Sequence, residues 1–182
     1  MKNLEGNIES GSEIIFPNDL DSIDIELISK QCKIQNATSK EQIEGFAKAY
    51  SKAKKLALDN SRLDSFTSEQ VKSFILELGV LVERRNQKGF RQIPVTFKNG
   101  QKALDAEKIS QAIDGFCRGM ITLLKDPAED ERLNIILLYT EFEKIHPFED
   151  GNGRVGDLIW KILKTRKEGA WPKELPPDVF NE

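Results

Sequence analysis

Apolar residues recur every three or four positions along most of the chain, and this spacing constrains the fold more than any other feature of the sequence. The period is that of an α-helix with one face turned inward. It runs through the segments 23–28, 39–57, 67–81, 105–124, 129–144 and 152–166. The segment 129–144 is apolar almost all round, which is typical of a helix surrounded by other helices. We therefore expect a mainly α fold, a helical bundle around a central buried helix.

Two of these helices carry start signals. Thr38 or Ser39 can cap the helix that follows, because a side-chain oxygen at that position accepts a hydrogen bond from a free backbone N–H group. Thr67 and Gln70 have the spacing of a capping box. The helices are expected to begin directly after these residues.

One segment departs from the helical period. Residues 90–97 are extended in character and are followed by Asn99-Gly100. That dipeptide is typical of a type I′ hairpin turn, in which both central residues need a positive φ. Pro94 would confine its strand to the edge of a sheet. We expect one small β-hairpin beside the helices.

Composition and charge exclude several classes of protein. A chain of 182 residues, 31% charged and 38% hydrophobic, fits one globular domain. The net charge of −3 argues against nonspecific nucleic-acid binding, which needs a surplus of Lys and Arg. No apolar run approaches the roughly 20 residues of a spanning helix, and the start lacks the apolar core of a signal peptide. We expect a cytoplasmic protein with neither nucleic acid nor a membrane among its partners.

The cysteines and the histidine limit the chemistry further. Cys32 and Cys117 lie far apart in the sequence, and we expect a buried thiol at Cys117, within an apolar helical pattern. His146 is the only histidine. With no cysteine pair at ligand spacing, zinc sites of the finger or zincin type are excluded. Any histidine chemistry must therefore run through His146.

A polar loop separates the last two helical segments. It holds the only histidine, two carboxylates, two glycines, an asparagine and an arginine in nine residues, His146-Pro147-Phe148-Glu149-Asp150-Gly151-Asn152-Gly153-Arg154. The glycines allow left-handed backbone and close approach to a ligand. Free N–H groups at the start of the next helix form an anion nest, which the helix dipole strengthens. The loop therefore predicts a phosphate site.

Individual side chains fit that chemistry. Arg154 offers a donor fork suited to phosphate, and Asp150 offers a hard oxygen for Mg²⁺. His146 is the candidate general base, because its ordinary pKa lies near neutrality. A structural interpretation competes with this one, since a loop histidine can end a helix and Gly-Asn-Gly can form a plain turn. The clustering of all these residues inside a bundle favours the functional interpretation, with Phe148 as an apolar anchor for the loop.

The same nine residues resemble the signature of the Fic (Fic/Doc, or Fido) family, His-Pro-Phe-x-Asp/Glu-Gly-Asn-Gly-Arg-x-x-Arg. Upstream, Gly89-Phe90-Arg91 followed by Val95 is similar to the family's segment leading into its substrate-aligning hairpin, the flap. The likeness covers roughly residues 40–166. It implies the Fic fold and a nucleotide-dependent transferase, usually moving AMP from ATP to a protein hydroxyl.

The resemblance also implies roles for single residues. His146 would deprotonate the acceptor hydroxyl, Asp150 would hold Mg²⁺ on the α- and β-phosphates, and Arg154 would neutralise the β/γ side. The backbone of Gly151, Asn152 and Gly153 would bind phosphate. The flap, about Arg91 to Leu104, would hold the target segment by strand addition.

One position departs from the pattern, because Asp157 replaces its last arginine. Residues three apart share a helix face, so Arg154 and Asp157 are both expected to look toward the loop, where a carboxylate would repel a triphosphate. Three interpretations stay open: adenylyl transfer with weaker γ-phosphate binding, transfer from another phosphorylated donor, or a catalytically silent interaction domain. If a lost cation limits the site, Asp157→Arg should tighten ATP binding.

Autoinhibition is a separate question. Many family members carry a helix with Ser/Thr-x-x-x-Glu-Gly/Asn, whose glutamate blocks productive ATP binding. Leu4-Glu5-Gly6-Asn7 resembles the end of this motif, although position 1 is Met. Glu5 is therefore a candidate inhibitory residue. Ile43-Glu44-Gly45, with Lys40 at the Ser/Thr position, fits an ordinary helix surface more simply.

The sequence thus predicts a Fic-type protein adenylyltransferase, with Mg²⁺ as cofactor and ATP as substrate, acting on a Ser, Thr or Tyr hydroxyl of a target protein. We divide the chain into an N-terminal segment 1–35, a Fic-like catalytic core 36–168 and a C-terminal tail 169–182. The target protein, the donor nucleotide and the oligomeric state do not follow from the sequence.

Overall fold

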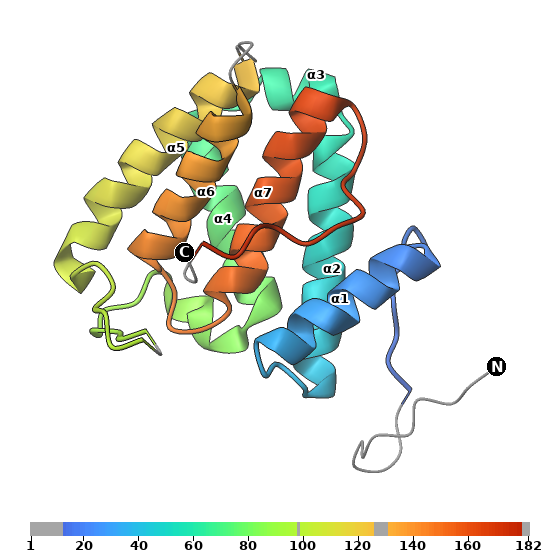
Figure 1. The fold of residues 1–182 in the computed structure, drawn as a ribbon, viewed down its shortest axis with the longest axis horizontal. Coiled ribbons are helices and arrows are strands. Elements are labelled where there is room, and N and C mark those ends of the chain that lie inside the picture. Colours follow the sequence, from blue (N-terminus) through green and yellow to red (C-terminus); the bar gives the residue numbers. More distant parts are fainter. Residues whose placement is uncertain (1–12, 98, 126–130, 180–182) are drawn as a thin grey trace.

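The computed structural model describes residues 13–97, 99–125 and 131–179, and within these ranges it is built almost entirely of helices (Figure 1). This confirms the expected mainly α fold. None of the helices in these ranges has the length and apolar character needed to cross a membrane. The elements are α1 (Ser22–Ile34), α2 (Lys40–Ala57), α3 (Asn60–Asp64), α4 (Ser68–Val82), the 3₁₀ helices η1 (Arg84–Lys88) and η2 (Ala106–Lys108), α5 (Ile109–Lys125), α6 (Glu131–Ile145) and α7 (Asn152–Glu168).

The helix starts follow the capping residues that the sequence indicates. The Ser39 hydroxyl accepts a hydrogen bond from the Gln42 N–H group at the start of α2. Thr67 and Gln70 form the reciprocal pair of a capping box before α4. These caps use backbone donors that a helix leaves unpaired in its first turn, so the helix starts are set by local chemistry.

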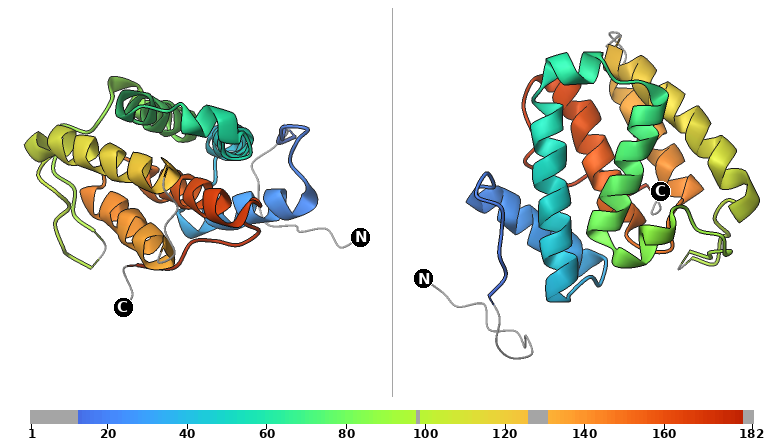
Figure 2. Two further views of the ribbon diagram at one scale, coloured as in Figure 1. Left: turned by 90° about the horizontal axis from the view of Figure 1, so that it is seen from above. Right: turned by 180° about the vertical axis from the view of Figure 1, so that it is seen from behind.

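The central helix is α7, which corrects the expectation that the segment 129–144 occupies the middle. Helix α7 contacts α2, α4, α5 and α6. It lies between α2 and α6, with α4 behind it (Figures 1 and 2). Helix α6 is more peripheral, and its Leu137 side chain is 57% exposed. The apolar pattern misled here because α7 buries the charged residues Arg154, Asp157 and Lys161, which read as surface residues in a sequence.

The C-terminal tail covers the remaining side of the central helix. Residues 169–179 cross the front of α7 in Figure 1. The Trp171 ring packs edge-on against Tyr50 of α2, with 5.2 Å between the ring centroids. Lys173 donates hydrogen bonds of 2.7 Å to both Asp21 and Asp24. The tail is therefore a packed part of the bundle.

The β-hairpin is smaller than expected and has a different turn. Within the described ranges its pairing is a single antiparallel bridge between Thr96 and Lys102. Gly100 has φ +83°, but the turn closes between Phe97 and Gln101, whereas a type I′ turn would have only Asn99 and Gly100 between its paired residues. The Phe97 N–H group instead donates to the Gln101 carbonyl, across a three-residue loop with Gly100 as its left-handed residue.

The two cysteines are both free and buried, Cys32 in α1 and Cys117 in α5. Burial raises the pKa of each thiol, to about 11 and about 12 respectively. Both side chains are therefore neutral packing groups at pH 7, which confirms the expectation for Cys117.

Candidate functional site

The polar loop joins the end of α6 to the start of α7, the central helix. His146 has φ +50° and turns the chain out of α6, and Gly151 has φ +82° directly before α7. The Asn152 side chain closes the loop, since its Oδ1 accepts from the Phe148 N–H group at 2.8 Å and its Nδ2 donates to the Phe148 carbonyl at 2.9 Å. Phe148 is fully buried, as expected of an anchor. Asn152 therefore shapes the loop with its side chain and offers a ligand only its backbone.

The first turn of α7 presents free backbone donors. Among the described residues no side chain caps this helix, and the first intrahelical bond runs from the Val155 N–H group to the Gly151 carbonyl. The N–H groups of Asn152 and Gly153 precede that bond and lie at the positive end of a 17-residue helix. Such a helix start is suited to an anion.

Arg154 adds a buried positive charge to this turn. Its side chain has no exposed surface, and its Nη1 donates to the Val82 carbonyl at 2.8 Å. Its Nε and Nη2 are buried and have no hydrogen-bond partner among the described residues. The Nη2 lies 3.5 Å from Oδ1 of Asp150, so the unpaired side of the guanidinium faces the loop. Unpaired buried donors are costly, which favours an anion as their missing partner.

Asp150, the candidate metal ligand, is already paired in this structure. Its Oδ2 lies 2.5 Å from Nη2 of Arg85, and its Oδ1 accepts from the Gly151 N–H group at 2.6 Å. The Asn86 side chain donates to the Asp150 carbonyl at 2.9 Å and so ties η1 to the loop. Arg85 and Asn86 were missed from the sequence, because nothing local connects them to a loop more than 60 residues away.

His146 is held where its imidazole stays neutral. Burial lowers its pKa to about 4, against a smaller opposing effect of the Glu143 carbonyl. The Phe97 ring of the flap meets the imidazole edge-on, with 4.9 Å between the ring centroids. The imidazole Nδ1 is buried, and no acceptor in the described part of the chain, the Glu143 carbonyl included, meets it with good hydrogen-bond geometry. A neutral imidazole can accept a proton at pH 7, which is what a general base requires.

Arg91 connects the flap to this histidine. The buried guanidinium donates to the carbonyls of Ile93 and Leu104, at the two ends of the flap, at 2.7 and 2.5 Å. It also donates to the carbonyls of His146 and Ile145, at 2.7 and 3.3 Å. The sequence marked Arg91 only as part of a motif. The structure shows that this one side chain satisfies four backbone carbonyls and fixes the flap against the base.

Asp157 pairs with a residue further along α7, whereas the sequence led us to expect it to face the loop. Its carboxylate lies 3.2 Å from the Lys161 ammonium, one turn further along α7, and both side chains are buried. Glu143 of α6 is also buried beside this pair, and a Cβ on Gly156 would overlap its Oε1. Burial, together with a smaller effect of the neighbouring Asp157 carboxylate, raises the pKa of Glu143 to about 8. Asp157 is therefore a structural partner of Lys161. Its charge is balanced by that lysine, so we do not expect it to repel a triphosphate strongly.

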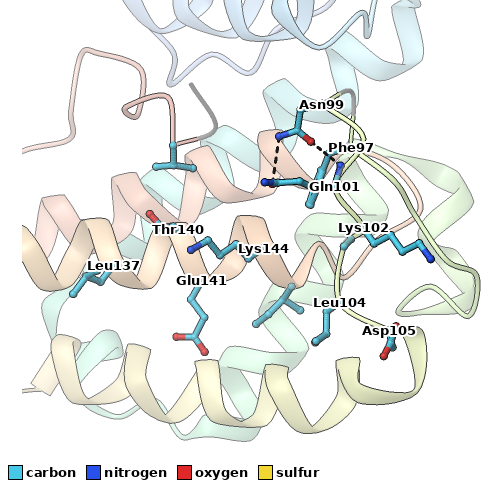
Figure 3. A pocket seen from close by; sticks show the side chains of 13 residues that line it. Phe97, Asn99, Gln101, Lys102, Leu104, Asp105, Leu137, Thr140, Glu141 and Lys144 are labelled. Atoms are coloured by element: carbon cyan, nitrogen blue, oxygen red, sulfur yellow. Dashed lines mark hydrogen bonds between the residues drawn. The ribbon is translucent and has the colours of Figure 1, made fainter. Parts of the chain in front are cut away.

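A groove of about 1000 Å³ lies next to the flap, between it and α6 (Figure 3). Flap residues and residues of α6 line it, and Val179 of the tail closes one side. Phe97 borders this groove and also contacts the His146 ring, so the groove begins beside the candidate base.

The two glutamates weighed as inhibitory residues have different outcomes. Glu5 lies outside the described residues. Glu44, in α2, accepts a hydrogen bond from the Ile15 N–H group at 2.9 Å and lies 3.6 Å from Lys40. Glu44 thus has ordinary surface partners, in line with the simpler interpretation of its segment.

Comparison with known proteins gives the same fold and motif. The family model described as the Fic/DOC family matches residues 73–163, half of the chain. The crystal structure of a Fic domain containing signaling protein from Bacteroides thetaiotaomicron is similar, with a TM-score of 0.60 and 20% sequence identity. The match covers 76% of this chain and 55% of that one, so this chain spans little more than half the length of that protein. Comparison with curated proteins found no match.

Proposed function

The chain belongs to the Fic/DOC family, and we propose that it transfers AMP from ATP to a Ser, Thr or Tyr hydroxyl of a target protein. The observation that carries this proposal is the charge balance at the start of α7. Among the described residues, two donor atoms of the buried Arg154 guanidinium have no hydrogen-bond partner, and no side chain caps the backbone donors of the adjacent helix start. A chain of phosphates supplies the acceptors that these groups lack.

His146 supplies the proton chemistry beside that anion site. The acceptor hydroxyl would attack the α-phosphorus, its proton would pass to the neutral imidazole, and the bond to the departing pyrophosphate would break. The pKa of about 4 keeps the imidazole free of a proton at pH 7 before ATP binds. Phosphates in the adjacent loop would raise this pKa, because an anion stabilises the imidazolium. The base would then be stronger in the complex than in the free protein.

Asp150 fits a Mg²⁺ ion of the kind that accompanies ATP. Such an ion is usually held by one or two carboxylates together with phosphate oxygens. Asp150 supplies one carboxylate at the loop, and its side chain is 39% exposed. When bound, Mg²⁺ would neutralise phosphate charge. The binding residues of this chain would remain Arg154 and the α7 backbone.

The flap and its groove support a protein as the acceptor. Arg91 fixes both ends of the flap, and the Thr96–Lys102 bridge pairs the two arms of the hairpin with each other, so that each arm keeps one outer edge. An extended segment can add to such an edge through backbone hydrogen bonds. The groove beside it, lined by Leu104 and Leu137 among others, would take side chains of that segment. The hydroxyl would then be presented next to His146.

Incubation with ATP labelled at different phosphates tests the proposal. Label that enters protein from the α-phosphate, and disappears in His146→Ala, supports adenylyl transfer. His146→Ala should lower the rate about 10²–10⁴-fold, with little effect on folding, since a general base contributes that much. Label from the γ-phosphate instead would indicate a kinase. Nucleotide binding without transfer to self or to proteins of a lysate would favour the silent interaction domain, and transfer from another phosphorylated donor would favour a different group.

A further inference from the structure

Arg85 lies beside the phosphate loop and is not part of the family signature. It belongs to η1, which follows α4 directly, and Asn86 ties that helix to the loop through the Asp150 carbonyl. The Arg85 side chain is 61% exposed, and its Nη2 lies 2.5 Å from Oδ2 of Asp150. Arg154 approaches the other oxygen of the same carboxylate. Two guanidinium groups therefore flank one loop carboxylate.

Binding of a triphosphate at the loop would require a second positive side chain besides Arg154. A triphosphate carries several negative charges, and the arginine that the family pattern places at position 157 is an aspartate here, paired with Lys161. Lys161 itself is buried and donates to the Glu174 carbonyl, so it is committed to the tail. Arg154 is then the buried cation at the loop, with one of its donors already used on Val82.

The geometry of Arg85 suits a side chain that changes partners. Glu83 orients it from behind, with its Oε1 3.2 Å from the Arg85 Nε. Burial alone would raise the pKa of Glu83, but the hydrogen bonds from Arg85 and Gln42 hold this pKa below its usual value. The Glu83 carboxylate therefore stays charged. The pair with Asp150 is largely exposed, and exposed ion pairs contribute little to stability. Arg85 can therefore leave Asp150 at small cost.

We infer that Arg85 is a second phosphate-binding residue of this loop, which turns from Asp150 to the terminal phosphates of the nucleotide. The inference rests on the proposed nucleotide site and names a residue of that site outside the family signature. It places the second cation on η1, whereas Asp157 lies on α7 and pairs with Lys161. The expected ligand class is a nucleoside di- or triphosphate, since a monophosphate would reach only the α7 end.

A double-mutant cycle separates a direct contact from an indirect one. Arg85→Ala uncovers the Asp150 carboxylate, which by itself would repel phosphate, so the cycle combines Arg85→Ala with Asp150→Asn. Inorganic tripolyphosphate, titrated by calorimetry into the full chain without divalent metal, is the probe. Arg84→Ala is the matched control, because it removes the same charge from the adjacent exposed position and leaves the Asp150 pair in place.

A direct contact predicts that Arg85→Ala weakens tripolyphosphate binding roughly tenfold in both the wild-type and the Asp150→Asn backgrounds, as for a lost charge-assisted hydrogen bond. Arg84→Ala should change it less than about twofold. An effect that vanishes in the Asp150→Asn background, or one equal to that of Arg84→Ala, would overturn the inference. So would a wild-type chain that binds no tripolyphosphate.

The same variants distinguish this inference from the proposed function. If AMP transfer occurs and Arg85→Ala behaves like Arg84→Ala, only the role of Arg85 is wrong. If Arg85→Ala loses tripolyphosphate binding but the wild-type chain transfers no AMP, the Arg85 contact holds and adenylyl transfer is wrong. ATP and AMP provide a second comparison, since Arg85→Ala should weaken ATP binding and leave AMP binding unchanged.

Discussion

The first turn of α7 and the segment one turn later are both charged and both buried, yet their charges are balanced in opposite ways. At the start of the helix, Arg154 and the backbone present donors for which the described part of the chain provides too few acceptors. Further along, the buried Asp157 carboxylate pairs with the buried Lys161 ammonium, and burial favours the neutral form of the neighbouring Glu143. The first region needs an anion from outside, whereas the second is neutralised from within. The comparison shows how one helix can hold a ligand site and a structural charge cluster side by side.

The largest effect is expected where the cluster loses its cation. Lys161→Met leaves the Asp157 carboxylate buried without its opposite charge and should lower the free energy of unfolding by about 3–5 kcal/mol. Urea denaturation measures this directly. The control is Lys167→Met, an exposed lysine on the same helix, which should cost less than about 1 kcal/mol. If the two variants lost equal free energy of unfolding, Lys161 would not be the residue that neutralises the buried carboxylate.

At the start of α7, we expect a substitution to change ligand affinity more than stability. Arg154→Met removes two buried donors that lack hydrogen-bond partners among the described residues, together with the hydrogen bond to the Val82 carbonyl. Because these two changes oppose each other, the free energy of unfolding should change by no more than about 1 kcal/mol in either direction. The affinity for ATP should nevertheless fall about tenfold to a hundredfold, the loss expected for hydrogen bonds to a charged group. Calorimetry and urea denaturation on one preparation test both. If Arg154→Met lost much stability and kept its ATP affinity, the start of α7 would be a structural region and not a ligand site.

A smaller effect is expected from the unpaired carboxylic acid of the cluster. The raised pKa of Glu143, about 8 against an ordinary 4.5, means that folding favours its protonated form. Its contribution to stability is therefore fully present below about pH 4.5 and is lost as the pH rises through 8. Glu143→Gln keeps the neutral shape, so its Tm should exceed that of the wild type by a few degrees at pH 8 and by almost nothing at pH 4.5. A constant difference between the two pH values would exclude this explanation, and Glu141→Gln, at an exposed position of α6, is the control.

The smallest effect concerns the base beside the loop. Because the pKa of His146 is lowered to about 4, kcat/KM for transfer should stay nearly constant from pH 7 to 5.5, where an ordinary histidine would have lost about nine tenths of its neutral form. The acid limb of kcat should lie at a higher pH than that of kcat/KM, since kcat reports the complex with phosphates bound. Coincident limbs near pH 6.5 would contradict the buried, neutral imidazole.

Local signals explain what the sequence could predict. Caps such as Ser39 and Thr67, the helical periods and the order of residues in the loop are all encoded within a few positions of one another. The contributions of Arg85 and Arg91 are not encoded locally, because each side chain contacts a loop residue that is more than 50 positions away in the sequence. The identity of the central helix was also out of reach, since buried ion pairs gave α7 the appearance of a surface helix.

Asp157 is the instructive case between these extremes. Its spacing from Arg154 suggested a shared face, but its spacing of four from Lys161 is equally favourable for a pair, and that is the contact formed. Asp157→Arg would place a second cation beside Lys161 in the core. We now expect that substitution to destabilise the fold and not to tighten ATP binding, which replaces the expectation from the motif alone.

Backbone amide chemical shifts, followed by NMR during titration with Mg-ATP, test the central claim most directly. The claim is that phosphates bind at the first turn of α7 and leave the charge cluster untouched. We expect large, saturable shifts for the N–H groups of Asn152, Gly153 and Arg154, with small changes at Asp157 and Lys161. Saturable shifts centred on Asp157 and Lys161, or no shifts in the loop at saturating nucleotide, would contradict it.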